Sequence, residues 1–323
     1  MVGQPSRLRP VLRAVAAILG VAVVAVLAQT LRRDGPGALA AWRTAHVQWG
    51  FVALAVGCGF AGHAIYLIGW RRLLRDSDIP VSIWPLAKIF LVSNLGRYLP
   101  GGKAWQMGIV GIMAAEHGLP ATQLAASSLL QGVIGVGTGA IVLFVAGGAA
   151  VGVPTAWLAL PVAGIIGVLL APAIIRSIPA VRAILVRNVH GIDTITFATM
   201  WALVWTSLAS WVLWGIALYY LASALLPTPG ARLASYIAAW SGSFLAGLIA
   251  VVSPAGLGAR EGVIQVVLEK AGMRASDVLL VVVVTRGWIT LMDVVPALAV
   301  LILRRRASTT SRSSPQAGLG TVE

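Results

Sequence analysis

Two polar, helix-breaking stretches set between long apolar runs constrain this chain more than any other feature. The first break, residues 93–105, reads Ser-Asn-Leu-Gly-Arg-Tyr-Leu-Pro-Gly-Gly-Lys-Ala-Trp, and the second break, residues 253–261, reads Ser-Pro-Ala-Gly-Leu-Gly-Ala-Arg-Glu. Pro100 and Pro254 each remove a backbone hydrogen-bond donor, and the neighbouring glycines give the chain little reason to remain helical. Broken backbone at membrane depth is tolerated only where protein or a water-filled cavity covers it. We therefore expect the two breaks to face each other inside a bundle of membrane helices.

The membrane assignment itself follows from composition. Hydrophobic residues make up 59% of the 323 residues and charged residues only 11%, whereas soluble domains carry about 25% charged residues. The net charge of +14 would also suit a nucleic-acid-binding protein, but no basic run interleaved with aromatic residues lies on a soluble segment. Lys and Arg collect in the cytoplasmic loops of membrane proteins, so we expect no nucleic-acid partner. The single cysteine, Cys58, excludes an internal disulfide and a cysteine-based metal site, and we expect no metal or cofactor.

Six apolar stretches are long enough to cross the hydrocarbon core, which needs about 20 helical residues. They cover residues 11–31, 47–70, 122–149, 155–175, 197–226 and 278–303. The first stretch follows Arg7, Arg9 and Arg13 and has the outline of a signal peptide. It lacks a clear small-x-small cleavage site, so we interpret it as an uncleaved first span.

The two breaks interrupt segments that do not read as full spans, at residues 83–115 and 233–270. Each half of the chain, about 11–149 and 154–303, then reads span, span, broken hairpin, span. Three full crossings per half is an odd number, so the second half enters the membrane from the opposite side, as in the inverted repeats of many secondary transporters. The predicted fold is an all-α polytopic membrane protein with six transmembrane spans and two opposed re-entrant helical hairpins.

The distribution of basic residues predicts the orientation. With a cytoplasmic N-terminus, fourteen Lys and Arg residues fall in cytoplasmic segments, six fall outside and four lie within the bundle, which accounts for all 24. This bias favours cytoplasmic N- and C-termini, although the pair Arg32–Arg33 falls on the outer side. We expect a cytoplasmic N-terminus at 1–10, a membrane domain at 11–305, and a Ser/Thr-rich, disordered cytoplasmic tail at 306–323.

Charged side chains within the predicted bundle mark the candidate site, because each costs at least about 2.5–3.5 kcal/mol at mid-bilayer. Six lie near the breaks or in the last span: Arg97, Lys103, Arg260, Glu261, Arg286 and Asp293. Arg286 and Asp293 are seven residues apart, so they share a helix face but lie too far along the axis to pair directly. Each is expected to meet a residue elsewhere, such as Glu261 or Arg260. A buried salt-bridge network that only fixes the hairpins is the structural alternative to a binding site.

The chemistry of these residues favours an anionic ligand. Helices that restart after Gly102 and Gly258 present free backbone N–H groups, and nearby basic side chains complete a phosphate site. Arginine adds a bidentate geometry that suits a phosphate diester. The predicted substrate-binding residues come from both breaks and the last span: Asn94, Arg97, Tyr98, Gly101, Gly102, Lys103, Gly256, Gly258, Arg260 and Arg286. Glu261 and Asp293 are predicted to balance charge or couple protons.

The two breaks also carry a resemblance to a known family. Residues 94–102 and 253–261 resemble the flippase-like transmembrane region of lysylphosphatidylglycerol synthases, a region shared with stand-alone bacterial and archaeal membrane proteins, and the resemblance covers about residues 10–305. It implies movement of a lipid between the leaflets of a prokaryotic cytoplasmic membrane. In bifunctional members a soluble aminoacyl-transferase domain follows the membrane part. Here the chain ends shortly after the last span, so synthase activity is not expected.

The predicted function is translocation of an anionic phospholipid or a lipid-linked headgroup, with a phospholipid or polyprenyl-phosphate-linked substrate. Enzymes of envelope-lipid biosynthesis are the protein partners that the resemblance implies. No H-E-x-x-H or G-x-S-x-G motif is present, so we expect no catalytic residues. Two alternatives remain open: a membrane-embedded glycosyl- or aminoacyl-lipid transferase, and a non-transporting scaffold subunit. A transferase would be expected to need acidic residues in an outer loop, where Asp34, Glu269 and Asp277 are scattered candidates.

Overall fold

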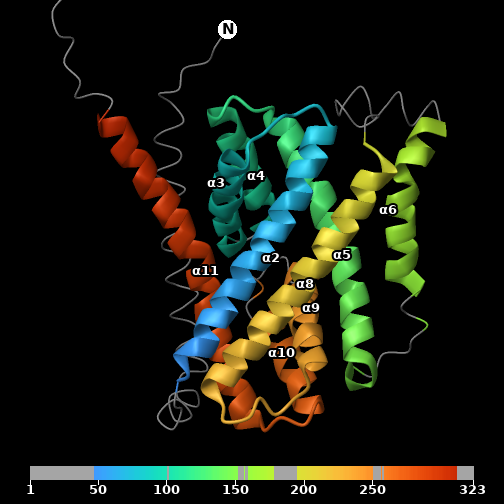
Figure 1. Ribbon diagram of the computed structural model, residues 1–323. Coiled ribbons are helices and arrows are strands. Elements are labelled where there is room, and N and C mark those ends of the chain that lie inside the picture. Colours follow the sequence, from blue (N-terminus) through green and yellow to red (C-terminus); the bar gives the residue numbers. More distant parts are fainter. Residues whose placement is uncertain are drawn as a thin grey trace, which may run out of the picture.

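The computed structural model describes residues 47–99, 102–151, 156, 159–177, 195–249, 256 and 258–310, and within these residues every regular element is a helix (Figure 1). The helices, with one 3₁₀ turn named η1, are α2 (Trp49–Asp76), α3 (Ile83–Asn94), η1 (Leu95–Tyr98), α4 (Gly102–Glu116), α5 (Ala121–Val151), α6 (Ala159–Ser177), α8 (Phe197–Leu225), α9 (Leu233–Ile249), α10 (Ala259–Lys270) and α11 (Ala275–Thr310). The predicted all-α architecture is confirmed for this part of the chain.

Four of the described helices are long and apolar enough to cross a membrane, and each contains 28 or 29 qualifying residues. They are α2, α5, α8 and α11, which correspond to four of the six predicted spans. The predicted span at 155–175 overlaps α6, a helix of 19 residues, and the predicted span at 11–31 lies outside the described residues. Large apolar side chains face outward on these helices; Trp49, Val145 and Leu291 are 61–74% exposed. An apolar outer surface of this kind is what a multi-pass membrane protein presents to lipid.

The most buried of the long helices are α8 and α11. In each, 61% of the apolar window is buried, compared with 28% in α2 and 33% in α5. α2 packs along α8 (Figure 1), and glycines allow the close approach: a Cβ at Gly62 would lie 2.8 Å from the Trp214 ring. Small residues at such crossings let helix backbones approach closely. α8 and α11 therefore contribute more buried residues to the packed interior than α2 and α5 do.

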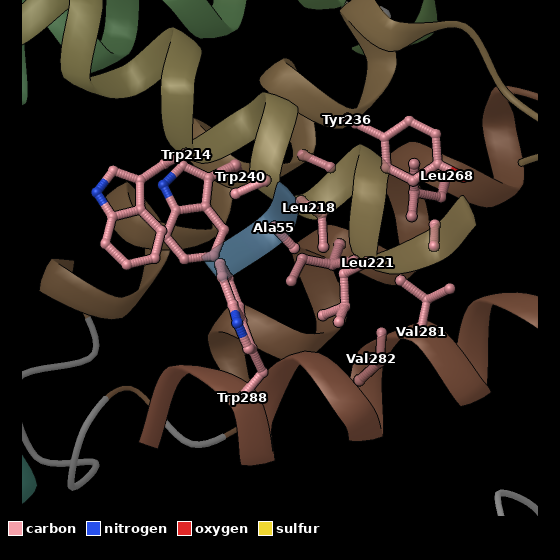
Figure 2. Close-up of a cluster of buried hydrophobic side chains, with 14 of the residues drawn as sticks. Ala55, Trp214, Leu218, Leu221, Tyr236, Trp240, Leu268, Val281, Val282 and Trp288 are labelled. Carbon is pink, nitrogen blue, oxygen red and sulfur yellow. The ribbon is translucent and has the colours of Figure 1, made fainter. Parts of the chain in front are cut away.

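An aromatic cluster fills the space between α8, α9 and α11. Trp214 and Trp240 stack with ring centroids 4.8 Å apart and an interplanar angle of 3°, and Trp288 packs edge-on against both rings (Figure 2). All three are less than 9% exposed. Offset stacking and edge-to-face contacts of this kind add to the burial of apolar area. The cluster therefore fixes α9 against α8 and α11.

The two broken segments are built from short helices. α3 and α4 contain 12 and 15 residues, and α9 and α10 contain 17 and 12, so each is about 18–26 Å long. In Figure 1, α3 and α4 lie in the upper half of the molecule, whereas α2 spans its full height, and α9 and α10 lie in the lower half. The inner ends of both segments contact α11, through η1 and through α10. The two breaks are thereby brought to one helix.

Candidate functional site

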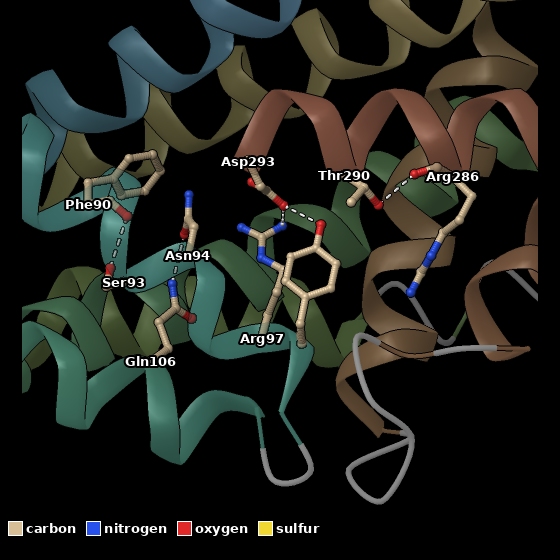
Figure 3. A network of polar contacts seen from close by, with 9 residues as sticks. Phe90, Ser93, Asn94, Arg97, Gln106, Arg286, Thr290 and Asp293 are labelled. Atoms are coloured by element: carbon tan, nitrogen blue, oxygen red, sulfur yellow. Dashed lines mark hydrogen bonds and ion pairs between the residues drawn. The ribbon is translucent and has the colours of Figure 1, made fainter. Parts of the chain in front are cut away.

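The first break lies between α3 and α4. α3 ends at Asn94, η1 follows, and α4 begins at Gly102, the glycine predicted to restart a helix. A Cβ at Gly96 would lie 2.6 Å from the backbone nitrogen of Gln106, and one at Gly102 would lie 2.9 Å from the carbonyl oxygen of Arg97. Only glycine fits at both positions, so η1 lies directly against the first turns of α4. Gln106 Nε2 also donates to Asn94 Oδ1 at 2.9 Å, which ties the two arms together (Figure 3).

η1 presents Arg97 and Tyr98 to α11. The Tyr98 hydroxyl donates to Asp293 Oδ2 at 2.9 Å. Arg97 Nη1 lies 3.4 Å from the same oxygen (Figure 3). Tyr98 is 1% exposed and Asp293 is 2% exposed, whereas 24% of the Arg97 side chain is exposed. Asp293 therefore meets residues outside its own helix, as expected, but they belong to the first break, whereas Glu261 and Arg260 of the second break were the suggested partners. Asp293 instead holds the first break against α11.

The second break uses backbone conformations that favour glycine. Gly256 has φ +68° and Gly258 has φ +83°, in the left-handed region that residues with a Cβ rarely adopt. α10 begins immediately after Gly258, and the backbone N–H of Gly258 donates to Glu261 Oε2 at 2.8 Å. Such a carboxylate in the first turn satisfies a donor that the helix itself cannot pair. The helix restart predicted after Gly258 is confirmed.

Glu261 also joins α10 to α11. Its Oε1 atom lies 3.1 Å from Arg286 Nη1, and the two side chains are 15% and 4% exposed. The expectation that Arg286 meets Glu261 is confirmed. One carboxylate thus caps the start of α10 through one oxygen and pairs with a buried arginine of α11 through the other.

Arg260 has different surroundings from the other two arginines. It is 6% exposed, and its guanidinium carbon lies 5.6 Å from the ring centroid of Trp240 and 5.5 Å from that of Phe244, both on α9. These distances are within the range of cation–π attraction. Its aliphatic part packs on α9, since a Cβ at Gly247 would lie 2.8 Å from Arg260 Cγ. Among the described residues, no carboxylate forms an ion pair with Arg260.

α11 organises the whole arrangement. Arg286 faces the second break and Asp293, two turns along, faces the first, while the Thr290 hydroxyl between them donates to the Arg286 carbonyl oxygen at 2.9 Å (Figure 3). The two breaks, which lie far apart in the sequence, thus both form ion pairs with one helix.

The remaining predicted residues are placed only in part. Lys103 lies in the first turn of α4, and Pro100, Gly101 and Pro254 lie outside the described residues. In the part of the chain that the structure describes, no three His, Cys, Asp or Glu side chains gather as metal ligands would.

Four residues of the site were not predicted from the sequence: Gln106, Trp240, Phe244 and Thr290. Trp240 and Phe244 are four residues apart and so share a face of α9, but aromatic residues at that spacing are common in any buried membrane helix. Gln106 carried a usable signal, because a glutamine just inside an apolar helix needs a hydrogen-bond partner.

The comparison with protein families gives one match. A family model described as the lysylphosphatidylglycerol synthase TM region matches residues 14–297. The matched range includes both breaks and the part of α11 that carries Arg286 and Asp293. None of the curated proteins matches the chain.

Proposed function

The chain belongs to the family of lysylphosphatidylglycerol synthase TM regions, and from this membership we propose that it translocates an anionic phospholipid or a lipid-linked headgroup between the leaflets of the cytoplasmic membrane. Family membership supports a function related to membrane lipids. The observation that carries the step to translocation is the convergence of both breaks on α11, through Arg97–Asp293 and Arg286–Glu261. Ionisable residues that far inside a membrane bundle typically mark the path of a polar substrate.

The architecture proposed for this path has six spans and two opposed re-entrant hairpins arranged as an inverted repeat. The helices α3, α4, α9 and α10, at about 18–26 Å, are shorter than the ~30 Å hydrocarbon core. Their positions in opposite halves of the molecule (Figure 1) support entry from opposite faces. Inverted repeats with broken helices at the midplane are typical of secondary transporters.

The proposed orientation has both termini in the cytoplasm. The C-terminal ends of α2 and α11 lie at the same end of the molecule in Figure 1. α2 ends with Arg71, Arg72 and Arg75, and the last turns of α11 include residues 304–306, which are all arginine. Two arginine clusters at one end support the assignment of that end to the cytoplasmic side.

In this proposal the lipid headgroup enters the polar centre while the acyl chains remain in the bilayer. Arg97, Arg260 and Arg286 attract the phosphate, and the positive φ angles of Gly256 and Gly258 shape the second break. Asp293 and Glu261 hold two of the arginines in place and limit the net positive charge of the centre. Proton coupling by these two carboxylates is part of the hypothesis. A pH gradient across the liposome membrane tests it, because coupled translocation should respond to the gradient.

The test is reconstitution of the full chain into liposomes that contain a trace of fluorescent phosphatidylglycerol. In protein-free liposomes, a quencher added outside should destroy about half of the label, because only the outer leaflet is accessible. With the protein present, we expect a larger fraction of the label to be destroyed. Arg97→Ala should slow this rise, and Arg72→Ala, at an exposed position near the end of α2, should not.

Three other results would count against the proposal. Failure to move any anionic lipid would refute translocation. Turnover of a glycosyl or aminoacyl donor by the purified chain would favour a transferase. Normal lipid-pathway function with Arg97→Ala and Arg260→Ala combined would favour a scaffold.

A further inference from the structure

We propose that Arg260 is the group that binds the anion of the substrate, that Arg97 and Arg286 are positioning residues, and that the anion is a singly charged phosphodiester. This assignment rests on the proposed function and gives different roles to arginines that the sequence treats alike. The evidence is that Arg97 and Arg286 each have a carboxylate partner, whereas no described carboxylate pairs with Arg260.

Arg97 and Arg286 are each engaged by a carboxylate, at 3.4 Å and 3.1 Å. Arg260 is as deeply buried as Arg286, at 6% and 4% exposure, but no described carboxylate forms an ion pair with it. A buried charge without a partner is strongly unfavourable, so a counter-ion is expected when the protein works. An anionic substrate would supply that counter-ion.

The neighbouring carboxylate cannot take this role in the observed geometry. Glu261 follows Arg260 in the chain, but one of its oxygens accepts from the Gly258 N–H and the other contacts Arg286. Successive residues on a helix point in directions about 100° apart. Arg260 is therefore turned toward Trp240 and Phe244 of α9 while Glu261 is turned toward α11.

The surroundings of Arg260 form a built site. Two aromatic rings hold the guanidinium, and Gly247 and Gly256 pack closely on its aliphatic part. Arg260 is the second residue of α10, so it belongs to the first turn of a helix, where unpaired N–H groups and the helix dipole favour an anion. A fixed, planar guanidinium can donate two parallel hydrogen bonds to a phosphate.

The charge balance indicates how many negative charges the ligand carries. Arg97 and Asp293 cancel, and Arg286 and Glu261 cancel, so the described side chains of the site leave one positive charge, that of Arg260. A phosphodiester carries one negative charge at neutral pH, whereas a phosphate monoester carries about −1.5 to −2. A zwitterionic headgroup brings an ammonium group next to this remaining positive charge. The site therefore favours phosphatidylglycerol over both phosphatidic acid and phosphatidylcholine.

The experiment measures binding directly, by calorimetric titration of the purified full chain in detergent with dihexanoyl forms of these three lipids. We expect phosphatidylglycerol to bind at least tenfold more tightly than either of the others. Arg260→Gln should remove this preference by weakening phosphatidylglycerol binding at least tenfold, and Arg260→Lys, which keeps the charge, should retain the preference at lower affinity. Arg72→Gln, an exposed arginine outside the site, should bind as the wild type does.

Unchanged phosphatidylglycerol binding by Arg260→Gln would overturn the assignment of Arg260. Tighter binding of phosphatidic acid than of phosphatidylglycerol by the wild type would overturn the single charge. The two proposals fail separately: binding that depends on Arg260 without translocation in liposomes would refute the transport function alone. Translocation with unchanged binding by Arg260→Gln would refute this inference alone.

Discussion

Replacing Asp293 by asparagine tests whether this carboxylate holds the first break against α11. The change removes the ion pair with Arg97 and weakens the hydrogen bond from Tyr98, while it keeps the shape of the side chain. Hydrogen bonds to charged groups contribute about 1.5–3 kcal/mol and neutral ones about 0.5–1.5 kcal/mol, so the Tyr98 bond should lose about 1 kcal/mol. Breaking a fully buried pair costs about 3–5 kcal/mol. Because 24% of the Arg97 side chain is exposed, we expect water to reduce that loss to about 1–2 kcal/mol.

The free energy of unfolding should therefore fall by about 2–3 kcal/mol, measured on the full chain by titrating mixed micelles with a denaturing detergent. The matched control is Asp277→Asn, which removes an ion pair of 2.9 Å to Arg274, a side chain that is 81% exposed. That control should cost less than about 1 kcal/mol. In the double variant with Arg97→Gln, the loss should be smaller than the sum of the single losses by about 1–2 kcal/mol. Equal losses for Asp293→Asn and Asp277→Asn would refute the reasoning.

Three further predictions concern the stability of the purified chain. Gly256→Ala should cost about 2–3 kcal/mol, because φ +68° and close packing both oppose a Cβ, whereas Gly262→Ala, with open space around it, should be neutral or stabilise α10 by up to about 1 kcal/mol. Arg260→Met should raise the unfolding temperature in lipid-free detergent, since it removes a buried charge that lacks a carboxylate partner; a lower unfolding temperature would point to a structural role. Gln106→Leu should cost about 1–3 kcal/mol because it leaves the buried Asn94 Oδ1 without the donor that it now has, and no loss would contradict the tie between the two arms.

The breaks and their charged residues could be predicted from the sequence because the bilayer restricts what an apolar chain can contain. A proline, paired glycines and an arginine within an apolar run have few explanations other than an interrupted helix that faces protein. That Arg286 needs a partner elsewhere was also predictable, since residues 286 and 293 are seven apart on one helix and cannot meet each other, and Glu261 was one of the two candidates. Which break Asp293 would contact was not predictable, because that depends on the side from which each segment approaches α11.

Helix ends show a second limit of sequence reasoning. The last span was predicted to end at residue 303, where the apolar run stops, yet α11 continues to Thr310 and passes through Pro296 without interruption. The length of an apolar run reflects the thickness of the hydrocarbon core. The helix itself ends only where its backbone hydrogen bonds end, which can be outside that core. The aromatic rings around Arg260 were missed for a related reason, since Trp240 and Phe244 differ from other apolar residues only in their contacts.

The two contacts of Glu261 have a mechanical consequence. One oxygen of this carboxylate accepts from the backbone at the start of α10, and the other pairs with the Arg286 guanidinium at the same time. If α11 tilts relative to α10, one of two changes follows. Either the Glu261 contacts break and the first turn of α10 begins to fray, or α10 moves with α11 and takes α9, which packs against it, along. Any rearrangement of α11 is therefore transmitted to the spot beside Arg260, without a separate linkage.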